Sequence, residues 1–221
     1  MLSESEIRQY VDALYETVYI VGITGIFVLV FGLSIGFILF VTQNPHMTKQ
    51  TKTMKLIHRV IATINDVARS IPFIILLIML IPLTRFLVGT MLGPKAALPA
   101  LIISATPFFA RVVHLALFEV SNDTIEAVRS MGASFKHLVY VIFKEALPAL
   151  VSGYTLTLVT LIGFMSAAAV IGAGGLAFLA YEYGKFGNNY TLMYLSIFTI
   201  LLFVFIIQIL GDKISRKLDH K

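Results

Sequence analysis

Long apolar runs separated by short charged segments dominate the pattern of this chain. The first such run, Thr17–Gln43, contains no charged residue. A helix needs about 20 mostly apolar residues to cross a bilayer, so this run predicts a membrane span. The same criterion, allowing charged residues in end turns, predicts spans at roughly 17–43, 60–87, 96–118, 148–171 and 188–211. The pattern predicts an all-α integral membrane protein with five transmembrane helices in one domain, 1–221.

The distribution of Lys and Arg predicts the orientation, because these residues concentrate in cytoplasmic segments. An external N-terminus leaves only Arg8, Arg85, Lys95 and Lys185 outside, and places the other thirteen of the 17 Lys and Arg residues in the cytoplasm. The reverse orientation would put those thirteen outside. We therefore predict an N-out/C-in topology, in which the segment 119–147 between the third and fourth spans is cytoplasmic.

Composition excludes several kinds of chemistry. Hydrophobic residues make up 58% of the chain and charged residues 13%, and the mean hydropathy is +0.90. The absence of cysteine excludes disulfides, thiolate metal sites and a cysteine nucleophile. The five histidines show no metal-ligand spacing, and no phosphate-binding P-loop motif occurs. The chain is therefore predicted to be non-catalytic, with no metal site.

Charged residues near the ends of the spans admit two interpretations. Asp66 and Arg69, three residues apart, can pair across one helical turn. With Arg111 and His114 they are either structural or they line a cytoplasmic vestibule. Since no charge falls at the centre of a span, a carrier driven by protons or sodium is disfavoured.

The cytoplasmic segment 119–147 carries its own helix signals. Asp123 and Glu126 suit the N-cap and N3 positions of a short helix. Gly132 suits the position after its end, where a left-handed backbone stops a helix. Ser134 can then cap a second helix that leads towards the fourth span.

Such a short helix needs a surface to lie on, because isolated helices of this length are marginal in water. Ile125, Val128 and Met131 recur at a spacing of three and form an apolar stripe. The stripe could rest on lipid headgroups or in a groove of a soluble partner. The near-zero net charge of the segment favours the partner, since lipid-seeking helices are normally basic. Pro148 is expected in the first turn of the fourth span.

The pair Glu126-Ala127, followed by Gly132-Ala133-Ser134 and Leu147-Pro148, resembles the "EAA" loop of bacterial ABC importer permeases. The likeness extends over most of the chain. The stretches ARSIPFIILL, ATPFFARVV and GAGGLA, at 68–77, 105–113 and 172–177, resemble the permease of the methionine importer family. The glycines of the last stretch also predict the end of the fourth span near the outer face.

The resemblance implies an ABC importer permease of the type I-like fold, in which 119–147 acts as a coupling-helix loop. It implies a homodimer, two copies of a cytoplasmic ABC ATPase subunit and an extracellular substrate-binding lipoprotein, surrounded by lipid in the bacterial plasma membrane and without nucleic acid. The implied function is ATP-driven import of an amino acid, methionine as the D or L form, by alternating access. This chain would bind no cofactor, and ATP and magnesium would be used by the partner ATPase.

The resemblance also assigns residues to the contact with the ATPase. These coupling residues are Asp123, Glu126, Ala127, Arg129, Met131, Gly132, Ala133 and Ser134. The sequence departs from the family pattern at Val128, where the pattern has alanine. A larger side chain there is expected to fit if it faces the partner's groove.

Span four is rich in small residues, which allow close helix packing. Beside that interpretation stands a second one, in which Phe164, Met165 and Ala168 form an apolar gate on the translocation path. Two other functions stay open at this point. One is a stand-alone secondary carrier, and the other is a membrane scaffold that docks a cytoplasmic partner.

Overall fold

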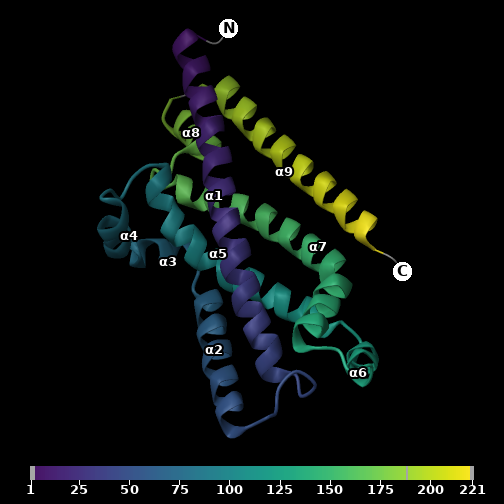
Figure 1. Ribbon diagram of the computed structural model, residues 1–221. Helices are drawn as coiled ribbons and strands as arrows, with labels where there is room; N and C mark the ends of the chain where they lie inside the picture. Colours follow the sequence, from purple (N-terminus) through teal and green to yellow (C-terminus); the bar gives the residue numbers. More distant parts are fainter. Residues whose placement is uncertain (1–2, 188, 220–221) are drawn as a thin grey trace. The chain divides into compact units, whose positions relative to one another are not determined.

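A computed structural model describes residues 3–187 and 189–219, and within these residues every regular element is a helix (Figure 1). The helices are α1 (Glu4–Gln43), α2 (Lys52–Ser70), α3 (Phe73–Met79), α4 (Ile81–Val88), α5 (Pro94–Phe118), α6 (Asn122–Ser130), α7 (Phe135–Ala169), α8 (Gly175–Lys185) and α9 (Tyr190–Leu218). The predicted all-α class is therefore confirmed.

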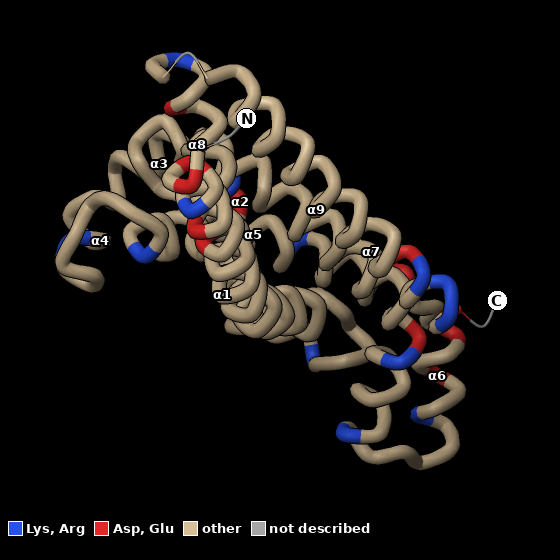
Figure 2. The backbone as a smooth tube through the Cα atoms, turned by 90° about the horizontal axis from the view of Figure 1, so that it is seen from above, with Lys and Arg blue, Asp and Glu red and all other residues tan. Residues whose placement is uncertain are grey.

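Four helices are long and apolar enough to cross a membrane: α1, α5, α7 and α9. Helices α2 and α3 together pass the same test as a fifth span, although they are bent by 102° at their junction. Figure 2 shows charge at the N-terminal end of α1 and none along its middle. The described residues thus support four spans, or five if the bent pair counts as one.

The range predicted as the second span, 60–87, contains three helices. Pro72 interrupts it with an extended backbone, φ −56° and ψ 134°. Proline has no amide hydrogen to donate, and it disfavours helical geometry in the residue before it. A second break follows at Leu80, and α4 then starts with Pro82 in its first turn, where proline is well tolerated. Gly89 ends α4 in a left-handed conformation, at φ +80°.

The chain divides into two compact units. Unit 1 combines the described residues up to Phe27 with Ile71–Ala105 and Leu158–Ile209. Unit 2 combines Val28–Ser70 and Thr106–Thr157 with the C-terminal residues from Leu210. The four long helices each contribute one part to each unit.

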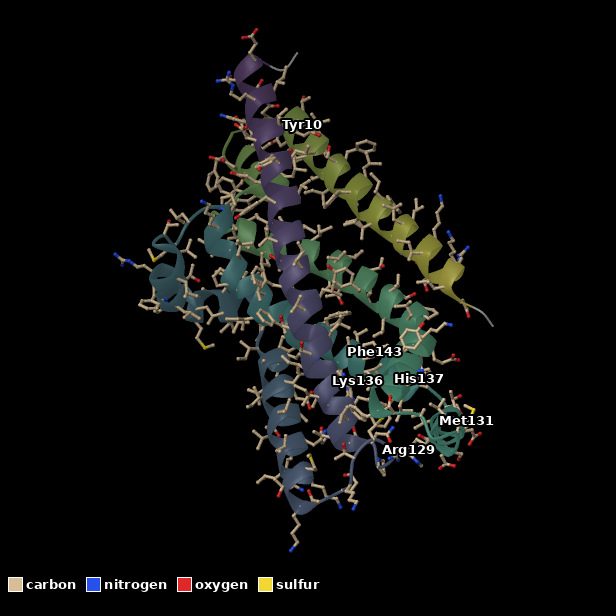
Figure 3. The ribbon with its side chains drawn as sticks, in the orientation of Figure 1. Tyr10, Arg129, Met131, Lys136, His137 and Phe143 are labelled. Atoms are coloured by element: carbon tan, nitrogen blue, oxygen red, sulfur yellow. The ribbon has the colours of Figure 1, made fainter. Side chains whose placement is uncertain are left out.

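In unit 1 the N-terminal part of α1 lies beside α8 and the start of α9 (Figure 1). Ala13, Leu176, Leu179 and Leu192 form a buried apolar cluster there. The Tyr10 hydroxyl, labelled in Figure 3, is hydrogen-bonded to Thr199 Oγ1.

Helix α1 starts with a capping box, which the sequence analysis did not identify. The Glu6 amide donates to Ser3 Oγ at 3.3 Å, and the Ser3 amide donates to Glu6 Oε2 at 2.7 Å. The bonds from the Ser3 backbone and hydroxyl stabilise the charged carboxylate and lower the pKa of Glu6.

The turn between α7 and α8 confirms the predicted end of the fourth apolar helix. Gly174 and Gly175 both have a φ of +78°, which other residues rarely adopt. Two side chains of α1 cap α8, because Glu16 Oε2 accepts from the Gly175 amide at 2.7 Å and Thr17 Oγ1 accepts from the Leu176 amide at 2.9 Å. A Cβ atom at Gly174 would also lie 2.9 Å from Pro94 Cγ, so both the positive φ and the available space favour glycine there.

In unit 2 the C-terminal half of α1 packs closely on α5. A Cβ atom added at Gly36 would lie 2.6 Å from the Ala110 carbonyl oxygen and 2.6 Å from Val113 Cβ. Small residues at helix interfaces let backbones approach one another in membranes. At the end of α1, Gln43 Oε1 accepts a 2.8 Å hydrogen bond from Nε2 of the buried His114 of α5. Helices α1 and α5 are therefore held by both packing and polar contact.

Candidate coupling site

Helix α6 begins earlier than its sequence signals predicted. The N-cap is Ser121, whose hydroxyl accepts from the Asp123 amide at 3.2 Å. The prediction that Asp123 is the N-cap is therefore wrong. Asp123 is the second residue of the helix, where its negative charge still favours the positive end of the helix dipole. A serine hydroxyl and an aspartate carboxylate are comparable caps, so the local sequence does not discriminate between them.

The end of α6 follows the prediction. Gly132 has a φ of +75°, and its amide donates to the Arg129 carbonyl at 2.9 Å. Ser134 then caps α7, with its hydroxyl accepting from the His137 amide at 3.4 Å. The turn between α6 and α7 is thus fixed at both sides by local hydrogen bonds.

Helix α7 continues from this turn into the fourth apolar segment without a break. Pro148 lies inside α7 and not in the first turn of a separate span, so that prediction is wrong. Since proline has no amide hydrogen, the Lys144 carbonyl lacks its usual helical donor. Nearby, the Ser215 hydroxyl of α9 donates to the Pro148 carbonyl at 2.9 Å. Ala146 and Leu150, two residues before and after the proline, are buried.

The predicted apolar stripe of α6 does not form one face towards a partner. The exposed fraction is 1% for Ile125 and 8% for Val128, whereas it is 78% for Met131. Ile125 and Val128 therefore anchor α6 to its own unit. The condition under which the larger Val128 was expected to fit, a side chain facing the partner's groove, is not met, because this side chain is buried inside the protein.

The outward face of α6 is formed by other residues. Asp123, Ala127 and Ser130 are all exposed and are separated by four and three residues, which places them on one side of a helix. Figure 3 shows Met131 at the outside of α6, at the end of this face. A small alanine between two polar residues leaves a shallow surface that another protein can approach closely.

A second side of α6 is tied to the connection between α1 and α2. Arg129 Nη1 donates to the His46 carbonyl oxygen at 2.5 Å, and Figure 3 shows Arg129 on that side of the helix. The His46 Nδ1 atom lies 3.4 Å from Glu126 Oε1. Sequence reasoning missed His46, because a histidine some 80 residues before α6 gives no local signal of this contact.

The three residues predicted as a gate lie on α7 in unit 1. The ring of Phe164 stacks on that of Phe73, with centroids 4.9 Å apart and an interplanar angle of 10°. Met165 and Ala168 are buried in their own unit, whereas Gly163 and Ser166 of the same helix are exposed. The gate therefore stays a prediction.

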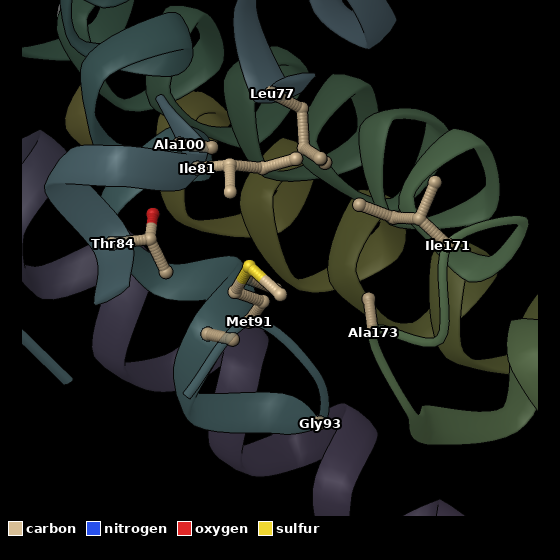
Figure 4. A pocket seen from close by; sticks show the side chains of 10 residues that line it. Leu77, Ile81, Thr84, Met91, Gly93, Ala100, Ile171 and Ala173 are labelled. Carbon is tan, nitrogen blue, oxygen red and sulfur yellow. The ribbon is translucent and has the colours of Figure 1, made fainter. Parts of the chain in front are cut away.

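Unit 1 contains a small cavity next to α3 and α4 (Figure 4). Its volume is about 20 Å³, which is room for about one water molecule. The lining residues are Leu77, Ile81, Thr84, Met91, Gly93, Ala96, Ala97, Ala100, Ile171 and Ala173. An amino acid does not fit in this cavity.

Both interpretations of the charged residues find support in unit 2. Asp66 pairs with Arg69 at 3.8 Å, as predicted. Asp66 also lines an open cleft of about 400 Å³ together with Lys55, His58 and Arg59. Among residues 3–187 and 189–219, no group of three or more His, Cys, Asp or Glu is placed to hold a metal ion.

Comparison with known proteins gives consistent matches. The model of the family described as "Binding-protein-dependent transport system inner membrane component" matches residues 47–220. The chain is 43% identical over 211 residues to the methionine import system permease protein MetP of Bacillus subtilis, covering 95% of this chain and 93% of the relative. It is also 43% identical over 210 residues to the probable D-methionine transport system permease protein MetI of Haemophilus influenzae, covering 95% and 97%.

Solved structures match the fold over nearly its whole length. A chain in the structure described as "Inward facing conformations of the MetNI methionine ABC transporter" aligns with a TM-score of 0.91 and 39% identity, covering 99% of this chain and 100% of that chain. A chain of an amino acid ABC transporter crystallised with histidines aligns with a TM-score of 0.64 at 20% identity, and this second match bears on the fold alone.

Proposed function

The chain belongs to the family of binding-protein-dependent transport system inner membrane components, and from this membership we propose that it is the permease subunit of an ATP-driven methionine importer. It is a multi-pass protein of the bacterial plasma membrane and is not itself an enzyme. The observation that supports methionine as the substrate is the match to methionine permeases at 43% identity over 95% of the chain. Uptake of labelled D-methionine and L-methionine, measured separately, distinguishes the two forms of the substrate.

The proposed assembly is a homodimer of this chain with two copies of a cytoplasmic ATPase subunit and an extracellular substrate-binding lipoprotein. ATP and magnesium would be used by the ATPase, and this chain would bind neither. A symmetric dimer suits the architecture, because four or five spans in one copy enclose little by themselves and a twofold axis doubles their number around a central path.

Helix α6 is the element proposed to receive the ATPase. Its buried residues, Ile125 and Val128, fix it to the permease, and its exposed face with Asp123 and Ala127 remains for the partner. This division follows the helix-in-groove mode of recognition, in which one face of a short helix fits a surface depression. Gly132, Ala133 and Ser134 set the direction in which α7 continues from the docked helix.

The proposed mechanism is alternating access driven by the ATPases. When they close on ATP, the two α6 helices of the dimer approach each other, and the rigid turn at Gly132 passes this displacement to α7. The part of α7 with Phe164, Met165 and Ala168 is proposed to close or open the path. Since Met165 and Ala168 are packed within their own unit, the gate moves as part of the helix.

The alternative functions have less support. A secondary carrier requires mid-membrane ionisable groups or a broken-helix ion site. The long helices α1, α5, α7 and α9 carry their charges outside the centres of their apolar stretches, and the charged residues beside the break between α2 and α3, Asp66 and Arg69, pair with each other. A scaffold would account for α6 but not for the likeness to import permeases over 95% of the chain.

The experiment that tests the proposal is co-purification with a co-expressed ABC ATPase subunit of a methionine importer, followed by uptake of labelled methionine in proteoliposomes. Ala127→Arg places a long charged side chain at the centre of the α6 face. We expect it to weaken ATPase binding by about 2 kcal/mol or more, roughly thirtyfold, as for a central interface residue. Ala127→Ser is the matched control, since it keeps the small size. If Ala127→Arg binds the ATPase as well as Ala127→Ser does, this face is not the docking surface.

A further inference from the structure

His46, in the connection between α1 and α2, contacts α6 in two different ways. The His46 carbonyl oxygen accepts a hydrogen bond from Arg129 Nη1 at 2.5 Å. Its imidazole Nδ1 lies 3.4 Å from Glu126 Oε1. Glu126 and Arg129 are three residues apart and so lie on one side of α6. All three residues, which we name the His46 cluster, belong to unit 2.

The backbone around His46 is held in place by its own hydrogen bonds. The Asn44 side-chain oxygen accepts from the His46 amide at 2.8 Å, in the geometry of an Asx turn. The Asn44 carbonyl accepts from the Met47 amide at 3.1 Å. Asn44 and Met47 are both buried. The carbonyl that Arg129 reaches is therefore presented in a fixed direction.

The chain itself links α6 only to α5 and α7, through residues 119–121 and 131–134. A displacement of α6 would reach those two helices through the backbone. It would reach the end of α1 and the start of α2 only through contacts such as those at His46. The His46 cluster therefore attaches α6 to the connection between α1 and α2, in addition to its covalent links to α5 and α7.

On the basis of the proposed function, we propose that His46 is a positioning residue for the coupling helix. The imidazole orients Glu126, and the carbonyl anchors Arg129, so that motion of α6 also moves the end of α1 and the start of α2. Glu126 keeps 61% of its side chain exposed. Its carboxylate can therefore contact the ATPase while His46 limits its rotation.

The test uses the complete transporter in proteoliposomes and measures labelled methionine imported per ATP hydrolysed. His46→Ala removes the imidazole and keeps the carbonyl, whereas Arg129→Met removes the guanidinium and keeps a long side chain. We expect each to lower this ratio by about twofold to fivefold, the range for partly exposed charged contacts. The double variant is expected to lower the ratio of imported methionine to hydrolysed ATP about tenfold, because both contacts join α6 to the same connecting segment. ATP hydrolysis continues in all three variants.

Two further variants separate positioning from a general effect on folding. His46→Gln restores a hydrogen-bond donor that can reach Glu126 and is expected to recover most of the ratio lost in His46→Ala. His137→Ala is the matched control, because it removes another imidazole of the same unit, one that is exposed and whose ring lies 6.2 Å from that of Tyr140. It is expected to leave the ratio unchanged.

A distance measurement provides a readout independent of transport. The chain contains no cysteine, so Asn122→Cys, at the exposed start of α6 and away from the side with Asp123 and Ala127, introduces a single site for a spin label. The distribution of distances between the two labels of a dimer should broaden in the double variant and not with His137→Ala. Unchanged coupling and an unchanged distribution in the double variant would overturn the role of His46. Failure of the wild-type chain to bind an ATPase or to import methionine would instead overturn the proposed function.

Discussion

Gly132 shows how a single residue can control the coupling helix. Its φ is +75°, and a Cβ atom added there would meet nothing within 4 Å. The requirement for glycine is therefore conformational and not a matter of space. Replacement of Gly132 by another L residue raises the free energy of this left-handed conformation by about 1–2 kcal/mol. Asparagine is among the best tolerated replacements.

Gly132→Val is predicted to displace α6 relative to α7 and to lower the yield of ATPase that co-purifies with the permease. Gly132→Asn adds a side chain of similar size but is compatible with the left-handed conformation, and it is expected to retain the ATPase. The measurement is the molar ratio of ATPase to permease after affinity purification. Equal ratios for the two variants would show that backbone conformation at this residue is unimportant.

The residues of the α6 region differ in how far the sequence could predict them. Gly132 and Ser134 were predicted correctly, because a left-handed glycine and a helix cap depend on neighbours a few residues away. The choice between Ser121 and Asp123 as N-cap failed, since both residue types cap helices well. His46 could not be predicted, because its contact with Arg129 depends on tertiary structure.

At the scale of elements, two glycines of α1 have different environments, and one of them lies in the contact of α1 with α5. A Cβ atom at Gly36 would lie 2.6 Å from the Ala110 carbonyl oxygen, whereas one at Gly22 would meet nothing within 4 Å. A backbone atom cannot move aside as the end of a flexible side chain can. The same substitution should therefore have opposite consequences at the two positions of one helix.

Gly36→Ala is predicted to destabilise the protein by about 1–3 kcal/mol through overpacking, while Gly22→Ala is predicted to be neutral or slightly stabilising because alanine favours the helix. Thermal unfolding of the purified variants in detergent measures the difference. An equal melting temperature for Gly36→Ala and the wild type would show that α1 and α5 are not in close contact at this point.

The start of α8 depends on side chains from α1 rather than on its own sequence. Glu16 and Thr17 accept hydrogen bonds from the amides of Gly175 and Leu176, which would otherwise lack a partner at the helix start. The carboxylate also lies at the positive end of the helix dipole. These two contacts link the first and eighth helices within unit 1.

Glu16→Ala combined with Thr17→Val is predicted to open the first turn of α8. Loss of a helix cap costs about 0.5–2 kcal/mol, so the amides of Gly175 and Leu176 should exchange hydrogen roughly tenfold faster. Hydrogen exchange with mass spectrometry resolves the segment. Asp12→Ala removes an exposed carboxylate one turn earlier on α1 and serves as the control. Unchanged exchange in the double variant would contradict the capping role.

The elements illustrate which features hydropathy can predict. The long apolar helices α1, α5, α7 and α9 follow from continuous uncharged runs, and their existence was predicted correctly. The break between α2 and α3 was not predicted, because charge and hydropathy do not respond to the loss of one amide donor at Pro72. Pro148 shows the opposite case, in which a residue that usually interrupts helices lies inside the continuous helix α7.

At the scale of the whole molecule, a single copy exposes many large apolar side chains. On α9 these include Phe198, Leu201, Phe205 and Ile209, which is the pattern of a helix that faces lipid or another subunit. A protein with this surface is stable only when lipid or another subunit covers it. The surrounding lipid and the second copy of the proposed homodimer would each cover part of this apolar surface.

The predicted orientation places α6 in the cytoplasm, where an ATPase can reach it, and the absence of cysteine makes this directly testable. Ser5→Cys and Ser130→Cys each introduce one thiol, before the apolar part of α1 and on α6 respectively. We expect a membrane-impermeant maleimide to label Ser5→Cys in right-side-out vesicles and Ser130→Cys only in inside-out vesicles. The reverse orientation would place thirteen of 17 basic residues outside, against the charge bias of membrane insertion. Labelling of Ser130→Cys from the outside would remove α6 from the reach of any cytoplasmic ATPase, and the coupling mechanism would fail with it.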